Sequence, residues 1–377
     1  MSDIKRGCDV EAEQKLKEWA LEQYQLLDWV DEDATISWLP IQGDAGFRHY
    51  YRLDIKCSEV LYPEVRDIKH SIGSAPSAIA VYAPVDTEDS PQFFRVANIL
   101  RDGGVHTPCL LAHDFAQGFM LLEDLGSTVL LNELNDESVD GFYGEAMMSL
   151  LRIQQCRHDF SVFPLYSRKK LHDEMCLFPE WFVGQLLDTH LSSDEVKLLH
   201  DTFNLLIASA LEQPNVVVHR DFHSRNLMCL ESSDLGVIDF QDAVIGPVTY
   251  DLASLLRDCY VVWDEEKVLN WALAYANMAV DVGILPRVDV NTFIRWFDWM
   301  GLQRHIKVLG VFSRLSIRDC KHGYLNDIPL VIHYVRSIAK KYHELDAFSQ
   351  WFEKRLMPTI REAEWMHETE MQKRESQ

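Results

Sequence analysis

The sequence predicts an α+β chain of two lobes, in which a strand-rich first third precedes a largely helical remainder. Short apolar runs rich in β-branched and aromatic residues recur within residues 34–122 and predict strands. Beyond residue 126, apolar residues recur at helical spacing, interrupted by strand-like runs between residues 216 and 239. A chain of 377 residues with 47% apolar composition can fill two hydrophobic cores.

The first lobe is predicted to begin with a helix and to contain strands and a second helix. Residues 11–29 repeat apolar side chains along one stripe, so this helix is expected to pack onto the lobe. Strands are expected at residues 36–41, 49–55, 78–82, 110–114 and 118–122. Ser90 as a cap and Pro91 at the first helical position predict a helix that ends before residue 103. The polar stretch 62–76 is expected to be a mobile connection.

The second lobe is predicted to be helical apart from a short strand-rich insert. Helices are expected at residues 139–152, 194–211, 250–262, 267–282, 290–309 and 329–342. A hairpin turned at residues 231–234 would bring Asn226 and Asp239 side by side. We therefore expect an N-terminal helical segment at 1–33, a first lobe at 34–122, a hinge at 123–126, a second lobe at 127–362 and a charged tail at 363–377.

Composition excludes several classes of function. The formal net charge of −23 disfavours a nucleic-acid surface, which needs clustered Lys and Arg. The acidity suits a polycationic substrate, or it reflects solubility alone. The eight cysteines form no Cys-x-x-Cys pair, and neither a signal-type apolar segment nor an 18-residue apolar run occurs. We expect a cytoplasmic protein with reduced thiols and without nucleic-acid or membrane partners.

The most informative motif follows the β-branched run at residues 216–218. Asp221 comes directly after it, Asn226 lies five residues further on, and Asp239 ends the next strand. In phosphoryl transfer, one carboxylate orients and deprotonates the attacking hydroxyl, while an amide and a second carboxylate hold magnesium. We expect Asp221 to be the catalytic base and Asn226 and Asp239 to be the metal ligands. Turn-capping roles would explain each residue separately but not the ordered set.

Four segments resemble the aminoglycoside phosphotransferase superfamily, the small-molecule branch of the protein-kinase-like fold. They are residues 43–52, 118–126, 219–252 and 303–321. More narrowly, the chain is similar to the anomeric kinases that phosphorylate N-acetylmuramic acid and N-acetylglucosamine at the 1-hydroxyl in cell-wall sugar recycling. The superfamily at large does not share the last segment, which favours the sugar kinases over the antibiotic kinases.

The resemblance implies a bilobal protein-kinase-like fold with ATP and Mg²⁺ as cofactors. It implies an amino-sugar substrate and a product passed to a sugar-1-phosphate nucleotidyltransferase. The expected ATP-binding residues are Gly43, Asp44, Ala45, Gly46, Phe47, Arg48, Arg52, Glu123, Asp124 and Leu125. Two glycines allow backbone amides to approach phosphates closely, although a plain hairpin turn would look the same. Likewise, the 123–125 segment reads either as an adenine-binding hinge or as a strand end with an acidic turn.

One feature departs from the usual kinase pattern. The predicted strand at residues 78–82 has no Lys to grip the α and β phosphates. Arg48 or Arg52 would replace this cation, unless each is a solvated surface residue. The anomeric kinases share the absence, so we interpret it as a family trait.

The remaining candidates support the loop or contact substrate. We expect His219 to buttress the catalytic loop by hydrogen bonding. Asp251 either caps a helix or, as the resemblance implies, also holds that loop. The substrate candidates are His223, Arg304, His305, Arg318 and Lys321. The cations among them would meet an anionic group such as a lactyl carboxylate.

Two alternative functions stay open on the sequence alone. An acidic pocket would favour a cationic acceptor, as in aminoglycoside, choline or homoserine type kinases. A nucleotide-binding pseudokinase scaffold is the other alternative, because the third predicted strand lacks its Lys. The intact set of Asp221, Asn226 and Asp239 argues against the scaffold.

Overall fold

The computed structural model describes residues 2–26, 35–41, 47–56, 77–231 and 234–366. They divide into two compact units, each assembled from two stretches of sequence. Unit 1 comprises Met1–Asn135 and Arg225–Gln241, and unit 2 comprises Asp136–Ser224 and Asp242–Gln377. The predicted mobile connection at 62–76 and most of the predicted tail lie outside the described residues.

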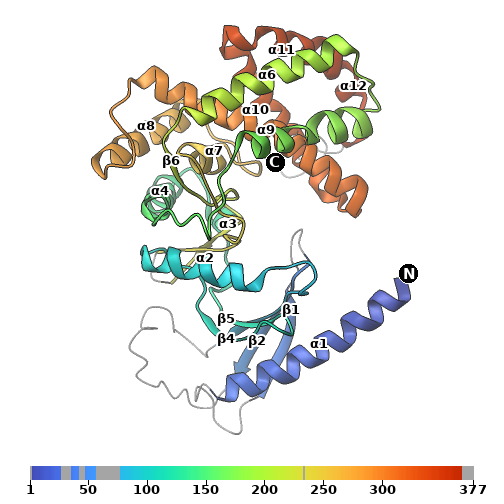
Figure 1. Ribbon diagram of the computed structural model, residues 1–377, viewed down its shortest axis with the longest axis vertical. Coiled ribbons are helices and arrows are strands. Elements are labelled where there is room, and N and C mark those ends of the chain that lie inside the picture. Colours follow the sequence, from blue (N-terminus) through green and yellow to red (C-terminus); the bar gives the residue numbers. More distant parts are fainter. Residues whose placement is uncertain (1, 27–34, 42–46, 57–76, 232–233, 367–377) are drawn as a thin grey trace. The chain divides into compact units, whose positions relative to one another are not determined.

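Unit 1 contains a five-stranded antiparallel sheet in the order β1-β2-β3-β5-β4 (Figure 1). Its strands are β1 (Thr35–Ile41), β2 (His49–Lys56), β3 (Ala78–Tyr82), β4 (Leu110–Asp114) and β5 (Phe119–Glu123). Every strand expected in this part of the chain is present within one residue of its predicted bounds. Short apolar runs rich in β-branched and aromatic residues were therefore a sufficient signal here.

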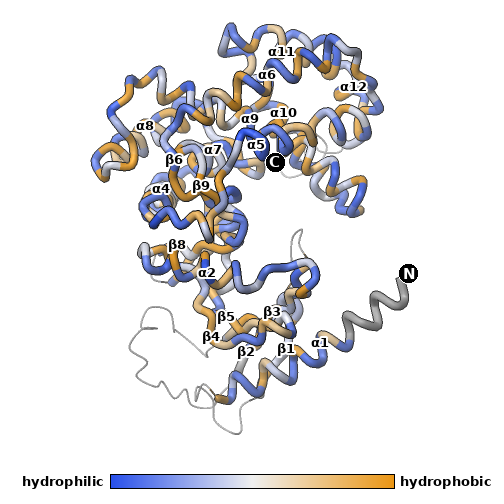
Figure 2. Tube along the Cα trace, in the orientation of Figure 1, coloured by the Kyte–Doolittle hydropathy of each residue, from blue (hydrophilic) through white to orange (hydrophobic). Residues whose placement is uncertain are grey.

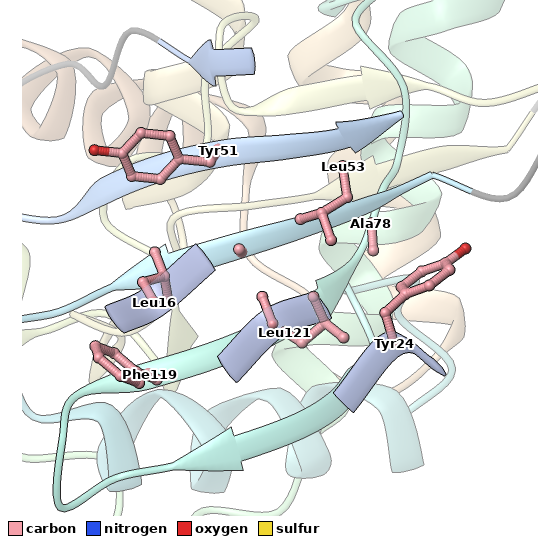
Figure 3. Close-up of a cluster of buried hydrophobic side chains, with 9 residues drawn as sticks. Leu16, Tyr24, Tyr51, Leu53, Ala78, Phe119 and Leu121 are labelled. Carbon is pink, nitrogen blue, oxygen red and sulfur yellow. The ribbon is translucent and has the colours of Figure 1, made fainter. Parts of the chain in front are cut away.

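Helix α1 (Ser2–Gln25) packs on one face of this sheet. Its Leu16, Ala20 and Tyr24 are fully buried, and their spacing places them on one stripe of the helix. They meet side chains that alternate along the strands, as Figure 3 shows. These strand residues are Tyr51, Leu53, Ala78, Ala80, Phe119 and Leu121. The expected packing of this helix onto the sheet is confirmed.

Helix α2 (Ser90–Asp102) belongs to the same unit. The predicted cap, Ser90, is wrong by one residue, because the Asp89 side chain accepts the backbone N–H of Gln92 at 2.8 Å. Ser90 is instead the first helical residue and Pro91 follows it. An Asp one position earlier satisfies the same orphan N–H groups and adds a negative charge at the positive end of the helix.

A short hairpin completes unit 1 although its sequence lies between two stretches of unit 2. Its strands are β7 (Leu227–Cys229) and β8 (Leu235–Val237), the second of which was expected at 235–238. The N–H of Val237 donates to the carbonyl of His106 at 2.8 Å, and that of Cys229 donates to Thr128 at 2.9 Å. A short helix, α3 (Leu130–Glu133), contacts β7, although the two elements are far apart in the sequence. These backbone bonds attach the hairpin to the rest of the unit.

Unit 2 is mainly helical, with a two-stranded antiparallel sheet of β6 (Asn215–Val218) and β9 (Val244–Pro247). Its longer helices are α4 (Val139–Gln155), α5 (Arg168–Met175), α6 (Ser193–Leu211), α7 (Tyr250–Leu256), α8 (Glu265–Asp281), α9 (Val290–Asp319) and α10 (Ile328–Lys341). Unit 2 also contains the π-helices Phe178–Leu186 and Phe352–Leu356, the 3-10 helices His322–Asn326 and His343–Leu345, and the α-helices α11 (Asp346–Trp351) and α12 (Met357–Glu362). Apolar and polar residues alternate along these helices (Figure 2), as expected of amphipathic elements.

Two predicted helix ends in unit 2 are wrong. Helix α7 ends at Leu256, six residues before the predicted end, and α9 continues to Asp319, ten residues beyond its predicted end. Gly310 does not break α9 but lets it pack closely, because a Cβ there would lie 2.4 Å from the backbone carbon of Leu177. The helix ends at Cys320, whose φ of 56° is left-handed. Among the described residues, no helix is both long enough and apolar enough to cross a membrane.

Candidate active site

The loop that follows β6 is held by a carboxylate from α7. Asp251 accepts the backbone N–H of His219 at 2.7 Å and that of Arg220 at 3.0 Å. The second bond stabilises a strained residue, since Arg220 has a φ of 79°. Asp251 is not the helix cap, because Thr249 occupies that position. Burial, supported by nearby Asp221 and opposed by the backbone donors, raises the pKa of Asp251 to about 7.

His219 supports the same loop from within. The backbone N–H of Asp221 donates to its Nδ1 at 3.3 Å, and its ring packs edge-on against Phe222. His219 is 1% exposed, which suits a structural role. Beyond the loop, the N–H and Oγ of Ser224 both donate to Oδ2 of Asp258, at 2.9 and 2.5 Å. The backbone around Asp221 is thereby anchored on both sides.

Asp221 is surrounded by positive charge. Burial on its own would raise the pKa of this carboxyl group, but nearby charged groups lower it to about 2. These groups are Lys307, His223, Arg220 and Arg304. Asp221 is therefore an anion at neutral pH and can accept a proton or orient a hydroxyl group.

Glu174 on α5 organises the cations near Asp221. Its carboxylate lies 2.6 Å from Nη2 of Arg220 and 3.4 Å from Nζ of Lys307. It also accepts the hydroxyl of Tyr166. Burial would raise the pKa of Glu174, but Lys307 and Arg220 lower it, so the group stays ionised. One carboxylate thus positions side chains from the catalytic loop and from α9.

Unit 1 carries a separate group of polar side chains around Asp239. Nδ2 of Asn226 lies 3.4 Å from Oδ2 of Asp239, so the hairpin brings the two residues side by side. Asp239 has a φ of 64° and also accepts Nε2 of Gln241 at 2.7 Å. Two oxygen ligands fit Mg²⁺, which is usually held by one or two carboxylates together with water and substrate phosphates. No cluster of three or more His, Cys, Asp or Glu side chains suited to a metal occurs in the described part of the chain.

Arg48 belongs to this group in unit 1. Its Nε lies 2.9 Å from Oε2 of Glu88, and its guanidinium lies 5.6 Å from the ring centre of Phe93. Phe93 stacks in turn on Phe240, the residue after Asp239. Burial would lower the pKa of Arg48, but Tyr50, Glu88 and Asp239 raise it. A buried cation therefore lies in the electrostatic field of the candidate metal ligand.

A family model described as the phosphotransferase enzyme family matches residues 37–287, more than half of the chain. The chain belongs to this family. This phosphotransferase is 36% identical to the N-acetylmuramate/N-acetylglucosamine kinase of Pseudomonas putida over 303 residues, which are 80% of this chain and 84% of the relative. A relative of the same name from Neisseria meningitidis serogroup B is 36% identical over 88% of this chain and 92% of its own length.

The phosphotransferase also shares its fold with solved structures at much lower identity. Choline kinase from Cryptosporidium parvum Iowa II superposes with a TM-score of 0.55 at 12% identity, over 86% of this chain and 95% of that structure. With the antiparallel sheet of unit 1 and the helices of unit 2, this likeness confirms the predicted protein-kinase-like fold.

Arg52 of the phosphotransferase has a structural environment that differs from that of Arg48. Its guanidinium binds Asp124 in a bidentate manner, at 2.7 and 3.0 Å, and donates to the carbonyl of Gly126 at 2.7 Å. Asp124 also accepts Ser77 Oγ and the N–H of Gly126. These bonds hold the segment after β5 in place, and they pair the positive charge of Arg52 with the carboxylate of Asp124. Both candidate replacements for the missing Lys are thus paired with a carboxylate, and Arg48 in addition lies in the electrostatic field of Asp239.

Two side chains of the expected hinge, Glu123 and Leu125, contact other residues of unit 1. Glu123 accepts the N–H of Cys109 at 3.1 Å and lies 3.6 Å from Nε2 of His106. Leu125 packs so close to Gly236 that a Cβ on that glycine would lie 2.7 Å from its Cδ1. Among the described residues, no hydrogen bond uses the backbone N–H of Leu125. Phe47 is exposed, and residues 43–46 lie outside the described part of the chain.

Of the substrate candidates, His223 and Arg304 are among the charged groups that lower the pKa of Asp221. His223 is 9% exposed and packs against Tyr260, while Arg304 is buried with Nη1 3.5 Å from Sγ of Cys259. His305 lies among buried groups, with Nε2 3.0 Å from the carbonyl of Arg257, and burial lowers its pKa to about 3.

The last two candidates, Arg318 and Lys321, lie at the end of α9. Arg318 is exposed and pairs with its neighbour Asp319 at 2.8 Å. Both cations lower the pKa of Asp319. Arg318 follows Arg304 along α9 by roughly 20 Å at about 1.5 Å per residue, and Lys321 comes after the end of this helix. Contact of these two residues with the substrate stays a prediction.

Sequence reasoning missed Glu174, Lys307 and Asp258. Glu174 and Lys307 are polar residues beside buried positions of α5 and α9, which was the available signal. That signal does not name a partner, because 46 residues separate Glu174 from Arg220. Arg220 lies within the motif, directly before Asp221, but its sequence position predicted no role for it.

Proposed function

We propose that the chain is a kinase that transfers a phosphoryl group from ATP to the anomeric 1-hydroxyl of N-acetylmuramate and N-acetylglucosamine. The observation that carries the proposal is the 36% identity to kinases of that name over 80% and 88% of this chain. The segment 303–321 supports it as well, since this segment resembles the sugar kinases and is not shared by the superfamily at large.

In this proposal Asp221 aligns the 1-hydroxyl and takes its proton as the sugar oxygen bonds to the γ-phosphorus. The bond between that phosphorus and the leaving oxygen of ADP breaks, so the product is a sugar 1-phosphate. Asn226 and Asp239 hold Mg²⁺, which would neutralise charge on the phosphates. His219 and Asp251 keep the catalytic loop in place.

ATP binding is assigned to unit 1. The backbone of Leu125 would pair with adenine, since its N–H has no other partner among the described residues. The glycine loop 43–47 would cover the phosphates, and Arg48 would supply the cation that β3 lacks. In kinases the third-strand Lys pairs with a Glu of the small-lobe helix. Here Glu88, two residues before α2, plays that part for Arg48.

The reaction is assigned to the cytoplasm, where ATP is available. Its product, a sugar 1-phosphate, is the kind of substrate that a nucleotidyltransferase converts to a nucleotide sugar. That class of enzyme would consume the product.

A panel of sugars with ATP and Mg²⁺ tests the proposed function. We expect phosphorus NMR to show an anomeric phosphate on N-acetylmuramate or N-acetylglucosamine. The alditols and the 1-O-methyl glycosides should be inert, because they lack the nucleophile that faces Asp221. Turnover of kanamycin, choline or homoserine without turnover of the amino sugars would disprove the substrate assignment. The cations around Asp221 argue against such cationic acceptors.

Replacing Arg48 by Met should weaken ATP and ADP binding by about 10- to 150-fold and leave adenosine binding unchanged, because the change removes a phosphate contact worth about 1.5–3 kcal/mol. Calorimetric titration with the three ligands measures the effect. Arg95→Met is the matched control, since Arg95 is exposed on α2 and bonds to Gln92. Equal loss of affinity for adenosine would show that Arg48 only supports the fold.

A further inference from the structure

Three cationic side chains lie close to two tyrosine rings in unit 2, beside the loop that follows β6. The rings of Tyr166 and Tyr250 meet edge to face with centres 5.4 Å apart. Arg220 lies 5.8 Å from the centre of Tyr166, and Lys170 of α5 lies 6.0 Å from the same centre. Lys307 is 5.9 Å from the centre of the other ring and 3.2 Å from its hydroxyl. Three cations therefore surround one pair of aromatic rings, and Arg220 directly precedes Asp221.

The three cations share the carboxylates around them unequally, and these carboxylates are Glu174, Asp221 and Asp242. Glu174 is in ion-pair contact with Arg220 and Lys307. Lys170 has no carboxylate within ion-pair distance among the described residues. Burial, together with Arg220, lowers the pKa of Lys170, and Glu174 and Asp242 oppose this shift without forming an ion pair with Lys170 among the described residues.

The proposed substrates differ by one anionic group. N-acetylmuramate is N-acetylglucosamine with an added lactyl ether, whose carboxylate is ionised at neutral pH. We propose that Lys170, supported by Lys307, binds this carboxylate and makes the site select the anionic sugar. The inference rests on the proposed function and adds the residue that distinguishes its two substrates. Arg220 and Lys307 are already engaged by Glu174, so Lys170 has the free charge.

Replacing Lys170 by Met tests this assignment. The KM for N-acetylmuramate should rise about tenfold or more, because a charge-assisted contact is lost. The KM and kcat for N-acetylglucosamine should stay within about twofold, since this sugar has no carboxylate. The amide of N-acetylmuramate should bind the wild type and the variant equally weakly. Lys170→Arg should retain most of the preference for the acid.

Lys169→Met is the matched control. Lys169 is the neighbouring residue on α5, but it is exposed and pairs with Asp173 at 2.5 Å. Its replacement should change the KM and kcat for neither sugar. The thermal midpoint of each variant is measured alongside, so that a loss of folding is recognised.

Each other outcome has a definite meaning. An equal loss for both sugars would overturn the inference, because it would assign Lys170 to the transferred phosphoryl group or to the loop. No change for either sugar would overturn it as well. If the wild-type protein phosphorylates neither sugar, the proposed function fails first, and the amide and acid titrations still report whether Lys170 binds a carboxylate.

Discussion

Replacing Asp221 by Asn is expected to lower kcat for the accepted amino sugar by about 10³-fold or more. The amide cannot take the proton and aligns the hydroxyl less well. Affinity for MgATP should stay nearly unchanged, because the proposed metal ligands are Asn226 and Asp239. Steady-state kinetics and a nucleotide titration on the same protein measure the two quantities.

Asp239→Asn is the contrasting variant, since it should weaken MgATP binding directly by removing an anionic ligand. The two substitutions therefore separate the base from the metal ligand. Activity of Asp221→Asn within tenfold of the wild type would remove Asp221 from the mechanism.

The pH dependence follows from the charges around this base. A pKa of about 2 leaves Asp221 ionised above about pH 4. Protonation of the base should thus cause no loss of kcat between pH 5 and pH 8. An acidic limb with a midpoint near pH 6 that disappears in Asp221→Asn would contradict the lowered pKa.

Replacing Asp298 by Ala is expected to destabilise unit 2 by about 3–5 kcal/mol. Asp298 is fully buried and lies 2.7 Å from Nη2 of Arg257, which is also fully buried. It further binds Lys341 at 2.6 Å and accepts the hydroxyl of Tyr342 at 2.5 Å. Among the described residues, its removal leaves the Arg257 charge in the core with Glu265, which is about half exposed, as its carboxylate partner at 2.9 Å.

Thermal unfolding of the full chain measures this loss, and the midpoint of unit 2 should fall by roughly 10 °C. Asp136→Ala is the control, because Asp136 forms an exposed pair with Lys267 that is worth at most about 1 kcal/mol. Similar midpoints for the two variants would show that the buried network adds little to stability.

The motif residues could be predicted because their relation is local. A β-branched strand, a loop and a hairpin place Asn226 beside Asp239 whatever the rest of the chain does. The sheet of unit 1 was equally predictable, since short runs rich in apolar, β-branched and aromatic residues mark its strands. The cap of α2 was misplaced by one residue, because Asp89 and Ser90 are both good caps and sequence alone does not rank them.

The surroundings of Asp221 could not be predicted for the opposite reason. Glu174 and Lys170 lie on α5 and Lys307 lies on α9, and these helices come together only when the chain folds. The spacing of the three residues in sequence therefore does not indicate which of them are in contact. Gly310 shows the same limit. A glycine within a helical pattern suggests an end, yet here it permits contact with the backbone of Leu177.

The split of unit 1 into two stretches of sequence has a consequence for synthesis on the ribosome. About one hundred residues separate the end of its first stretch from the end of its second. At roughly 5–20 residues per second, the nascent first stretch waits on the order of 5–20 s for the hairpin that covers it. During that time Phe93 lacks Phe240, and the carbonyl of His106 lacks the N–H of Val237. The part of the unit that carries the proposed metal ligands, Asn226 and Asp239, is thus the last part of it to be made.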